Sequence, residues 1–411
     1  MPMRAGFTPS CLVSQPMIDA GKWLYLALLA LLLCTTAHAA PRIGLVTMEP
    51  GETYWERFGH NAILVAPDDG SEPTLYNYGY FDFDEPNFFL RFAAGDMRYR
   101  LVALPVSEDL AYYTSVGRGV DLLWLDVAPD AAAQLAAFLA WNALPENAYY
   151  RYDYFADNCS TRVRDALDTA LDGALRKQLS GRSHGLSYRS ETLRLAAPAP
   201  WMALAIDLGA GPFADQNLSR WEESFIPMRL RDNLREMKTG KGTPLVIAEQ
   251  VLSPARLPAA PDAPPRWRWL FATLGIGLAI GMKALHTRMP RTVAVLIATW
   301  WTLLGISGLG IAALWAFTTH HAGFGNENLL LFNPLCLGLL PLAVALWRGQ
   351  RPSARMRHLL ALLAVLAALA LFLKFLPFRV QSNGDWIALV LPMQAMLALT
   401  LGRTRLEQPK D

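Results

Sequence analysis

The sequence predicts a soluble α+β domain on the outer face of a membrane, followed by a C-terminal bundle of five membrane-spanning helices. Three observations lead to this prediction: the overall composition, a secretory N-terminus, and a series of apolar runs in the last third of the chain. The 411 residues are 53% hydrophobic and 18% charged, which is too apolar for an ordinary soluble protein and too charged for a pure membrane bundle. The net charge of +2 gives no reason to expect a nucleic-acid partner.

Residues 1–39 are predicted to be a signal peptide. Lys22 precedes an apolar run from Leu24 to Leu33, and Ala37-His38-Ala39 provides small residues for cleavage before Ala40. The run is shorter than a comfortable membrane span. A retained N-terminal anchor is the alternative.

Five apolar runs follow a Pro/Ala-rich linker at 253–266, and each is long enough to cross a bilayer. The runs are Trp267–Leu285, Thr292–Ala316, Leu329–Trp347, Leu359–Phe378 and Trp386–Gly402. Lysines and arginines concentrate in alternate loops and in the tail at 403–411, whereas the loops 317–328 and 379–385 contain only Arg379. The positive-inside rule therefore places the tail in the cytoplasm, and an odd number of spans places residues 40–252 on the outer face.

Within 40–252 the pattern is mixed, without regular strand–helix alternation. His60–Ala66 and Thr74–Tyr80 read as a hairpin around Pro67-Asp68-Asp69-Gly70. Strands are also expected at 98–104 and 120–127, and a helix at 130–144. A further helix should begin at Cys159, because apolar residues from Val163 to Leu175 recur at helical spacing.

Cys159 is the first candidate for chemistry, because it is the only cysteine of this domain and an unpaired thiol outside the cytoplasm needs a reason to persist. Asp157 or Asn158 is a suitable N-cap, which puts Cys159 in the first helical turn. The N–H groups and the positive dipole end there should favour thiolate over thiol. The alternative is a buried structural cysteine.

His60 is the better candidate for a base, since it opens a strand, whereas His184 lies in a loop-like stretch. A group that orients the imidazole is expected on the neighbouring strand, with Asn77 as the first choice and Tyr78 as its rival. The register of the strands is needed to decide between them. A plain histidine at a strand end is the alternative reading.

The outer loop 318–328 carries His320, His321, Asn326 and Asn328, polar groups that could line a lipid or amine site at the membrane surface. A solvated loop explains them equally well, and a metal site has little support because adjacent histidines point in different directions. Arg189 could pair with a phosphate or with a carboxylate, the second being the simpler reading. The aromatic run 149–155 could form a wall for an acyl chain or simply pack in the core. No cofactor is expected.

These motifs together resemble a known family. A His-led strand followed much later by Asn-Cys at a helix start is similar to the circularly permuted papain-like fold of the NlpC and lecithin:retinol acyltransferase groups. The stretches FGHNAILV, LYNYGYFDFDEPNFFLRFAAGDMRYRL, YFADNCSTRVRD, SYR and DLGAGPFADQNLSRWEESFIPMRL, followed by five spans, resemble the Lnb-type bacterial lipoprotein N-acyltransferases over nearly the whole chain.

The resemblance implies a periplasmic catalytic domain on a multi-pass protein of the bacterial inner membrane. It also implies Cys159 as nucleophile and His60 as its base, with a phospholipid as acyl donor and a lipoprotein as acceptor. We expect Asn158, Tyr78, Arg189 and the outer-loop residues to bind these substrates.

Two other functions remain open. A membrane-anchored cell-wall amidase or peptidase would use the same papain-like domain on a polar substrate, with the spans serving as an anchor. A non-catalytic lipid-binding or assembly protein would not need Cys159 at all.

Overall fold

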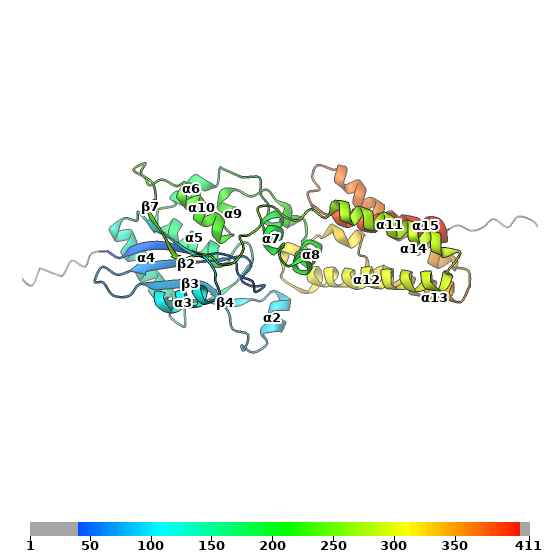
Figure 1. Cartoon of the computed structure of the whole chain (residues 1–411), viewed down its shortest axis with the longest axis horizontal. Coiled ribbons are helices and arrows are strands. Elements are labelled where there is room, and N and C mark those ends of the chain that lie inside the picture. Colours follow the sequence, from blue (N-terminus) through cyan, green and yellow to red (C-terminus); the bar gives the residue numbers. More distant parts are fainter. Residues whose placement is uncertain (1–39, 403–411) are drawn as a thin grey trace, which may run out of the picture.

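The computed structural model describes residues 40–402 and is elongated, with a mixed α/β domain at one end and a bundle of long helices at the other (Figure 1). The predicted signal peptide at 1–39 and the tail at 403–411 lie outside the described residues. An α+β domain followed by membrane-spanning helices confirms the predicted fold class.

One antiparallel sheet organises the first domain, and within residues 40–402 it contains seven strands in the order β6-β4-β3-β2-β1-β5-β7. The strands are β1 (Arg42–Met48), β2 (His60–Ala66), β3 (Thr74–Tyr80), β4 (Arg98–Pro105), β5 (Val120–Leu125), β6 (Tyr149–Arg151) and β7 (Val246–Ser253). Strand β1 is flanked by β2 and β5, and the β2–β3 pair is the predicted hairpin. A register shift between Asn77 and Tyr80 distorts β3 where it meets β4.

Helices cover both faces of the sheet, because side chains alternate across each strand. On one face, α4 (Pro129–Asn142), α5 (Cys159–Ala170) and α10 (Pro227–Arg235) pack on residues such as Leu45 and Ile63. On the other face, α3 (Val106–Ser115) packs on residues such as Val46 and Leu64. The beginning of β2 and the end of β3 meet at the same end of the sheet, which is where the candidate site lies.

Strands and helices were predicted well where local signals were strong and missed elsewhere. Strand β1 was not predicted, because its residues after Arg42 are all buried and show no alternation. Edge strand β7 and helix α3 were missed as well. The helix expected to run from Cys159 through Leu175 ends at Ala170, since Asp172 and Gly173 adopt positive φ, and α6 (Ala174–Leu179) follows.

Smaller elements connect the sheet to the membrane domain. Short helix α2 (Phe88–Ala94) projects from the sheet, and α7 (Tyr188–Ala196), α8 (Pro200–Gly209), 3₁₀ turn η1 (Pro212–Asp215) and α9 (Arg220–Glu223) follow α6. In Figure 1, α2, α7 and α8 lie at the end of the domain that faces the bundle.

Five helical segments in the described part of the chain are long and apolar enough to cross a membrane. They are α11 (Arg268–His286), α12 (Pro290–Phe317), the segment Glu327–Trp347, α14 (Ala354–Phe372) extended by η5 (Leu373–Phe375), and α15 (Gly384–Leu401). The third is irregular, consisting of η3 (Glu327–Leu330), η4 (Pro334–Leu339) and α13 (Leu340–Trp347). Pro334 lacks an N–H and opens η4, so the segment is not one continuous α-helix.

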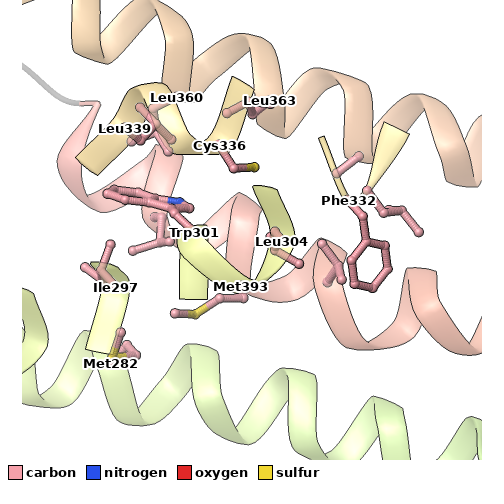
Figure 2. Packing of buried hydrophobic residues seen from close by; sticks show 14 of the residues in the cluster. Met282, Ile297, Trp301, Leu304, Phe332, Cys336, Leu339, Leu360, Leu363 and Met393 are labelled. Atoms are coloured by element: carbon pink, nitrogen blue, oxygen red, sulfur yellow. The ribbon is translucent and has the colours of Figure 1, made fainter. Parts of the chain in front are cut away.

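The bundle has its own apolar core, in which side chains from all five segments interdigitate (Figure 2). Trp301 is fully buried there, and Cys336 lies among Leu339, Leu360 and Leu363 (Figure 2). Cys336 is therefore a packing residue, which leaves Cys159 as the cysteine of chemical interest among the described residues.

Candidate active site

The start of helix α5 is fixed by a capping box. The Asn158 side chain accepts hydrogen bonds from the N–H groups of Ser160 and Thr161, and the Thr161 hydroxyl accepts one from the Asn158 N–H. The amide nitrogen of Asn158 donates to the carbonyls of Tyr154 and Phe225, at 2.9 Å each. Asn158 thus positions Cys159 as the first residue of the helix, and its hydrogen-bonding groups are already used within the protein.

A buried polar network ties this helix start to strand β2. The Asn61 amide donates to the Ser160 hydroxyl at 3.0 Å and accepts from Thr47 at 2.8 Å. Ser160 in turn donates to the Ser224 carbonyl at 2.7 Å. The network therefore joins the residue that follows His60 to the residue that follows Cys159, although the two are far apart in sequence.

His60 is held by a second relay on the α3 side of the sheet. Its Nε2 lies 3.0 Å from Asn77 Oδ1, and Asn77 Nδ2 donates to Asp109 Oδ2 at 2.9 Å. A carboxylate only accepts, so Asn77 must direct its NH₂ group toward Asp109 and its oxygen toward His60. His60 then donates from Nε2, which leaves the lone pair of Nδ1 free to accept a proton.

The Cys159 sulfur faces backbone N–H groups of Asn61, Ser160 and Cys159 itself. Cys159 is half-buried, so the residue remains within reach of a substrate. Space beside it depends on Gly79, which has a φ of +94°: a Cβ at this position would lie 3.3 Å from the Cβ of Cys159 and 3.8 Å from the Tyr150 hydroxyl. The donor N–H groups near the sulfur are suited to stabilise an oxyanion formed by attack on a carbonyl.

Both candidate catalytic groups are neutral at rest. Burial raises the pKa of the Cys159 thiol to about 11, against the lowering effect of the three N–H groups. Burial also lowers the pKa of His60 to about 4, against the hydrogen bond that the imidazole donates to Asn77, while Arg118 lowers it further. The expectation that the helix start would favour the thiolate is therefore wrong, because desolvation outweighs the local dipole.

Sequence reasoning missed three neighbours of this site. Asp109 lies on the unpredicted helix α3, and burial raises its pKa, which Asn77 and Arg118 partly oppose. Arg118 is 3% exposed, contacts Glu56 at 3.3 Å, and has an Nη2 without a hydrogen-bond partner in the described structure. The Tyr150 hydroxyl is likewise buried without a partner, although Tyr150 lies in the predicted aromatic run. No local sequence signal marks Asp109 or Arg118, since the tertiary fold brings them here.

The rivals considered from sequence lie elsewhere. Tyr78 points to the opposite face of β3 and donates to Asn142 at 2.8 Å. His184 lies 2.7 Å from Glu223 and also contacts Arg220. Neither side chain is hydrogen-bonded to the His60 relay.

The outer-loop histidines contact the first domain rather than Cys159. His320 Nε2 lies 2.9 Å from the Phe92 carbonyl, and its ring stacks on Tyr154. His321 Nδ1 lies 3.5 Å from Asp153. A role for these two residues in substrate binding stays a prediction.

Asn326 and Asn328 join the two domains. Asn326 donates to the carbonyls of Leu208 and Gly209 at the end of α8, and Asn328 donates to the Leu208 carbonyl at 3.0 Å. Their oxygens accept from Gln381 and Asn383. Both asparagines are buried and their hydrogen bonds are used, so their predicted contact with substrate would require the junction to open.

The Arg189 guanidinium is fully hydrogen-bonded within a buried ionic cluster beside this junction. It bonds Asp215 and Asp207 at 2.7–3.0 Å and also donates to the carbonyls of Ala210 and Gly211. These bonds use all five N–H donors of the guanidinium, which matches the carboxylate reading and leaves none for a lipid phosphate.

No metal site stands out: between residues 40 and 402, no group of three or more His, Cys, Asp or Glu side chains is placed to hold an ion.

Two family models match this chain. Residues 35–198 match the Lnb N-terminal periplasmic domain, and residues 265–405 match the Lnb transmembrane domain. The first match contains His60, Asn77 and Cys159, and the second contains the five apolar segments. No curated protein and no solved structure matches the chain.

Proposed function

We propose, from the premise that this chain belongs to the Lnb family, that it is a cysteine-dependent lipoprotein N-acyltransferase of the bacterial inner membrane. The family is lipoprotein N-acyltransferase-like, with a periplasmic domain followed by a transmembrane domain. The observation that carries the proposal is the meeting of three sequence segments at one end of the sheet: Cys159 at a helix start, His60 at a strand start, and Asn77 bonded to that imidazole.

In the first half-reaction the Cys159 sulfur attacks the ester carbonyl of a membrane phospholipid while His60 Nδ1 takes the thiol proton. Because both groups are neutral at rest, proton transfer accompanies attack instead of preceding it. The backbone N–H groups at the helix start stabilise the oxyanion. The ester C–O bond then breaks, the imidazolium protonates the leaving alkoxide, a lysophospholipid departs, and an acyl-thioester remains on Cys159.

In the second half-reaction the α-amine of a lipoprotein's diacylglyceryl-cysteine attacks the thioester. The amine must arrive unprotonated, and His60 removes the proton that it releases on forming the amide. The C–S bond breaks and the thiolate recovers a proton from the imidazolium. Covalent catalysis divides a difficult transfer into these two steps.

The membrane domain supports this proposal because both substrates are lipids. Residues of the outer loop contact the periplasmic domain directly, through Thr319 to Arg151 at 2.6 Å and His320 to Phe92 at 2.9 Å. The domain that carries the thiol is thereby held at the membrane surface, and neither acyl chain needs to cross bulk water.

The test is a reporter lipoprotein incubated with the purified full-length chain in phospholipid vesicles, read by mass spectrometry of its N-terminal peptide and of intact Cys159. We expect a new N-acyl group with the native chain, an acyl adduct on Cys159 before the acceptor is added, and neither product with Cys159→Ala or Cys159→Ser. Unchanged N-acylation in these variants would refute the thioester mechanism.

Two further readouts separate the alternatives. Isotope-labelled phospholipid shows whether the transferred acyl group comes from the vesicle lipid. An unlabelled N-acyl group would mean that the reporter's own glyceryl esters are the acyl donor, while the thioester mechanism would still hold. Release of muropeptides from purified cell wall would instead favour the amidase or peptidase alternative.

A further inference from the structure

The surface around helix α2 exposes more large apolar side chains than a soluble domain normally leaves in water. Phe89 and Leu90 are 68% and 72% exposed. Trp55, Phe83 and Phe92 are also exposed, and ring contacts at 5.3 Å (Trp55–Phe83) and 6.0 Å (Phe83–Phe89) make the surface continuous. We call these five residues the α2 patch. Contiguous apolar patches of this kind mark interaction sites.

The position of the α2 patch indicates which surface it contacts. The backbone N–H of Thr319 donates to the Ala94 carbonyl at 2.9 Å, and the Thr319 hydroxyl donates to the Gly95 carbonyl at 3.0 Å. Thr319 comes two residues after the exposed Phe317 at the outer end of span α12. Helix α2 is therefore tied to the end of span α12 that faces the first domain, and Figure 1 shows α2 at the end of that domain nearest the bundle. Aromatic side chains are the residues that soluble and membrane-spanning segments place at this interface.

Charged groups beside the patch fit a phospholipid surface. Arg98 and Arg151 are exposed cross-strand neighbours on the edge pair β4–β6, and Arg151 reaches the outer loop at Thr319. Exposed arginines near a membrane surface attract lipid phosphates. The one arginine of α2, Arg91, is paired with Glu85 at 2.5 Å, so the helix brings no uncompensated charge of its own to the apolar face.

A row of aromatic rings runs from the patch to the thiol. Phe88 packs on Phe81 with ring centroids 5.8 Å apart, Phe81 on Tyr99 at 5.1 Å, and Tyr99 on Tyr152 at 4.4 Å. Tyr152 in turn reaches the space over Gly79, where the Cβ of Cys159 also lies. Phe88 and Tyr99 are each 7% exposed, so an alkyl chain that follows this row to the sulfur must displace these two rings.

We infer that the α2 patch inserts into the outer leaflet of the bilayer and that the aromatic row behind it guides the acyl chain of the donor lipid to Cys159. The second half of this inference rests on the proposed function. The first half does not, because membrane insertion of α2 can be measured without any turnover.

The first experiment places the photocrosslinking amino acid p-benzoylphenylalanine at Leu90 of the full-length chain, in vesicles of phosphatidylethanolamine and phosphatidylglycerol. The matched control places it at Ile247, which is 59% exposed and belongs to β7, a strand labelled in Figure 1 at the side of the domain away from α2 and the bundle. We expect phospholipid adducts at position 90 and none at position 247. Equal yields at the two positions, or adducts with a protein in place of lipid at position 90, would overturn membrane insertion.

The second experiment compares Phe89→Ser/Leu90→Ser with the exposed control pair Ile247→Ser/Val251→Ser. We expect the rate of acyl-thioester formation from vesicle phospholipid to fall about tenfold in the first variant, since two exposed apolar side chains lose their contact with lipid, and to stay unchanged in the control. A short-chain, water-soluble ester should acylate Cys159 equally in both. A native rate from vesicles in the α2 variant would overturn the guiding role. Absence of any thioester in the unsubstituted chain would defeat the proposed function and leave the crosslinking result standing.

Discussion

Two polar clusters of this molecule were both predicted from the sequence to contact substrate, and their hydrogen bonding in the structure differs. The first, at the end of the sheet, contains His60, Asn77 and Cys159; the second, at the domain junction, contains Arg189 and Asn326. Both were expected to meet substrate. At the junction, Arg189 and Asn326 donate their hydrogen bonds to carboxylates and backbone carbonyls of the protein. At the sheet end, the Tyr150 hydroxyl and Arg118 Nη2 are left without partners in the described structure.

Between Arg189 and the sheet-end cluster, the difference is one of hydrogen bonding: the arginine has all its donors used, whereas groups at the sheet end do not. Unpartnered buried atoms such as Trp301 Nε1 and Asn383 Oδ1 also occur elsewhere in the described residues, so this feature has to be tested together with the chemistry of the group. A buried polar group without a partner costs free energy, so proteins rarely keep one without a use. A satisfied cluster can be equally buried and equally charged and still serve only to hold two domains together. The predictions below test this distinction by removing matched side chains from the two clusters.

The largest expected effect is on catalysis, from His60→Ala. Loss of the general base should lower the rate of acyl-thioester formation by about 10²- to 10⁴-fold while the protein stays folded. The matched control is His184→Ala, which removes the same imidazole from the Glu223–Arg220 cluster and should leave the rate per folded molecule unchanged. Quenched-flow mass spectrometry of Cys159 measures both. Equal losses in the two variants would remove the reason for assigning the base to His60.

The next effect falls on stability, from Arg189→Ala at the junction. Asp207 and Asp215 would remain buried without their cation, which should lower the free energy of unfolding by about 3–5 kcal/mol. The control, Arg235→Ala, removes a surface arginine paired with Asp232 and Glu249 and should cost at most about 1 kcal/mol. Thermal unfolding of the detergent-solubilised chain measures the difference. A large loss of rate per folded molecule in Arg189→Ala would return this residue to the substrate site.

A smaller effect is expected from Asn77→Ala. Its hydrogen bond orients the imidazole, so losing a bond of this kind should slow thioester formation about tenfold to a hundredfold. Tyr78→Phe is the neighbouring control, because its hydroxyl bonds Asn142 on the other face of the strand. A slower Tyr78→Phe with an unaffected Asn77→Ala would reverse the assignment of the orienting residue.

The features predicted from sequence were those with local signals. The hairpin of His60 and Asn77 follows from alternation around a turn, and the helix start at Cys159 follows from an Asn cap. The membrane segments follow from length and composition. Each signal lies within the residues that form the element, so no knowledge of the tertiary fold was needed.

The rest depends on contacts between distant segments. Asp109 accepts its hydrogen bond from Asn77 only because α3 packs on the sheet. Asn326 donates to backbone carbonyls at the end of α8, more than a hundred residues earlier in the chain. The ionisation of Cys159 was predicted with the wrong sign for the same reason: a helix start is visible in sequence, whereas the burial that raises the thiol pKa to about 11 is not.

The smallest expected effect concerns pH: the rate of the first half-reaction should hardly change with it. An imidazole with the ordinary pKa of 6.5 is only about 3% neutral at pH 5. Burial lowers the pKa of His60 to about 4, so the base stays mostly neutral down to pH 5 and the rate of thioester formation should be nearly flat from pH 8 to pH 5. Transfer to the lipoprotein amine provides the internal contrast, because an α-amine of ordinary pKa becomes protonated over this range and that half-reaction should slow. A fall in thioester formation with a midpoint near 6.5, in protein that is still folded by circular dichroism, would mean that the His60 imidazole is solvated in the working enzyme. The burial that lowers the pKa of His60 would then be absent while the enzyme works.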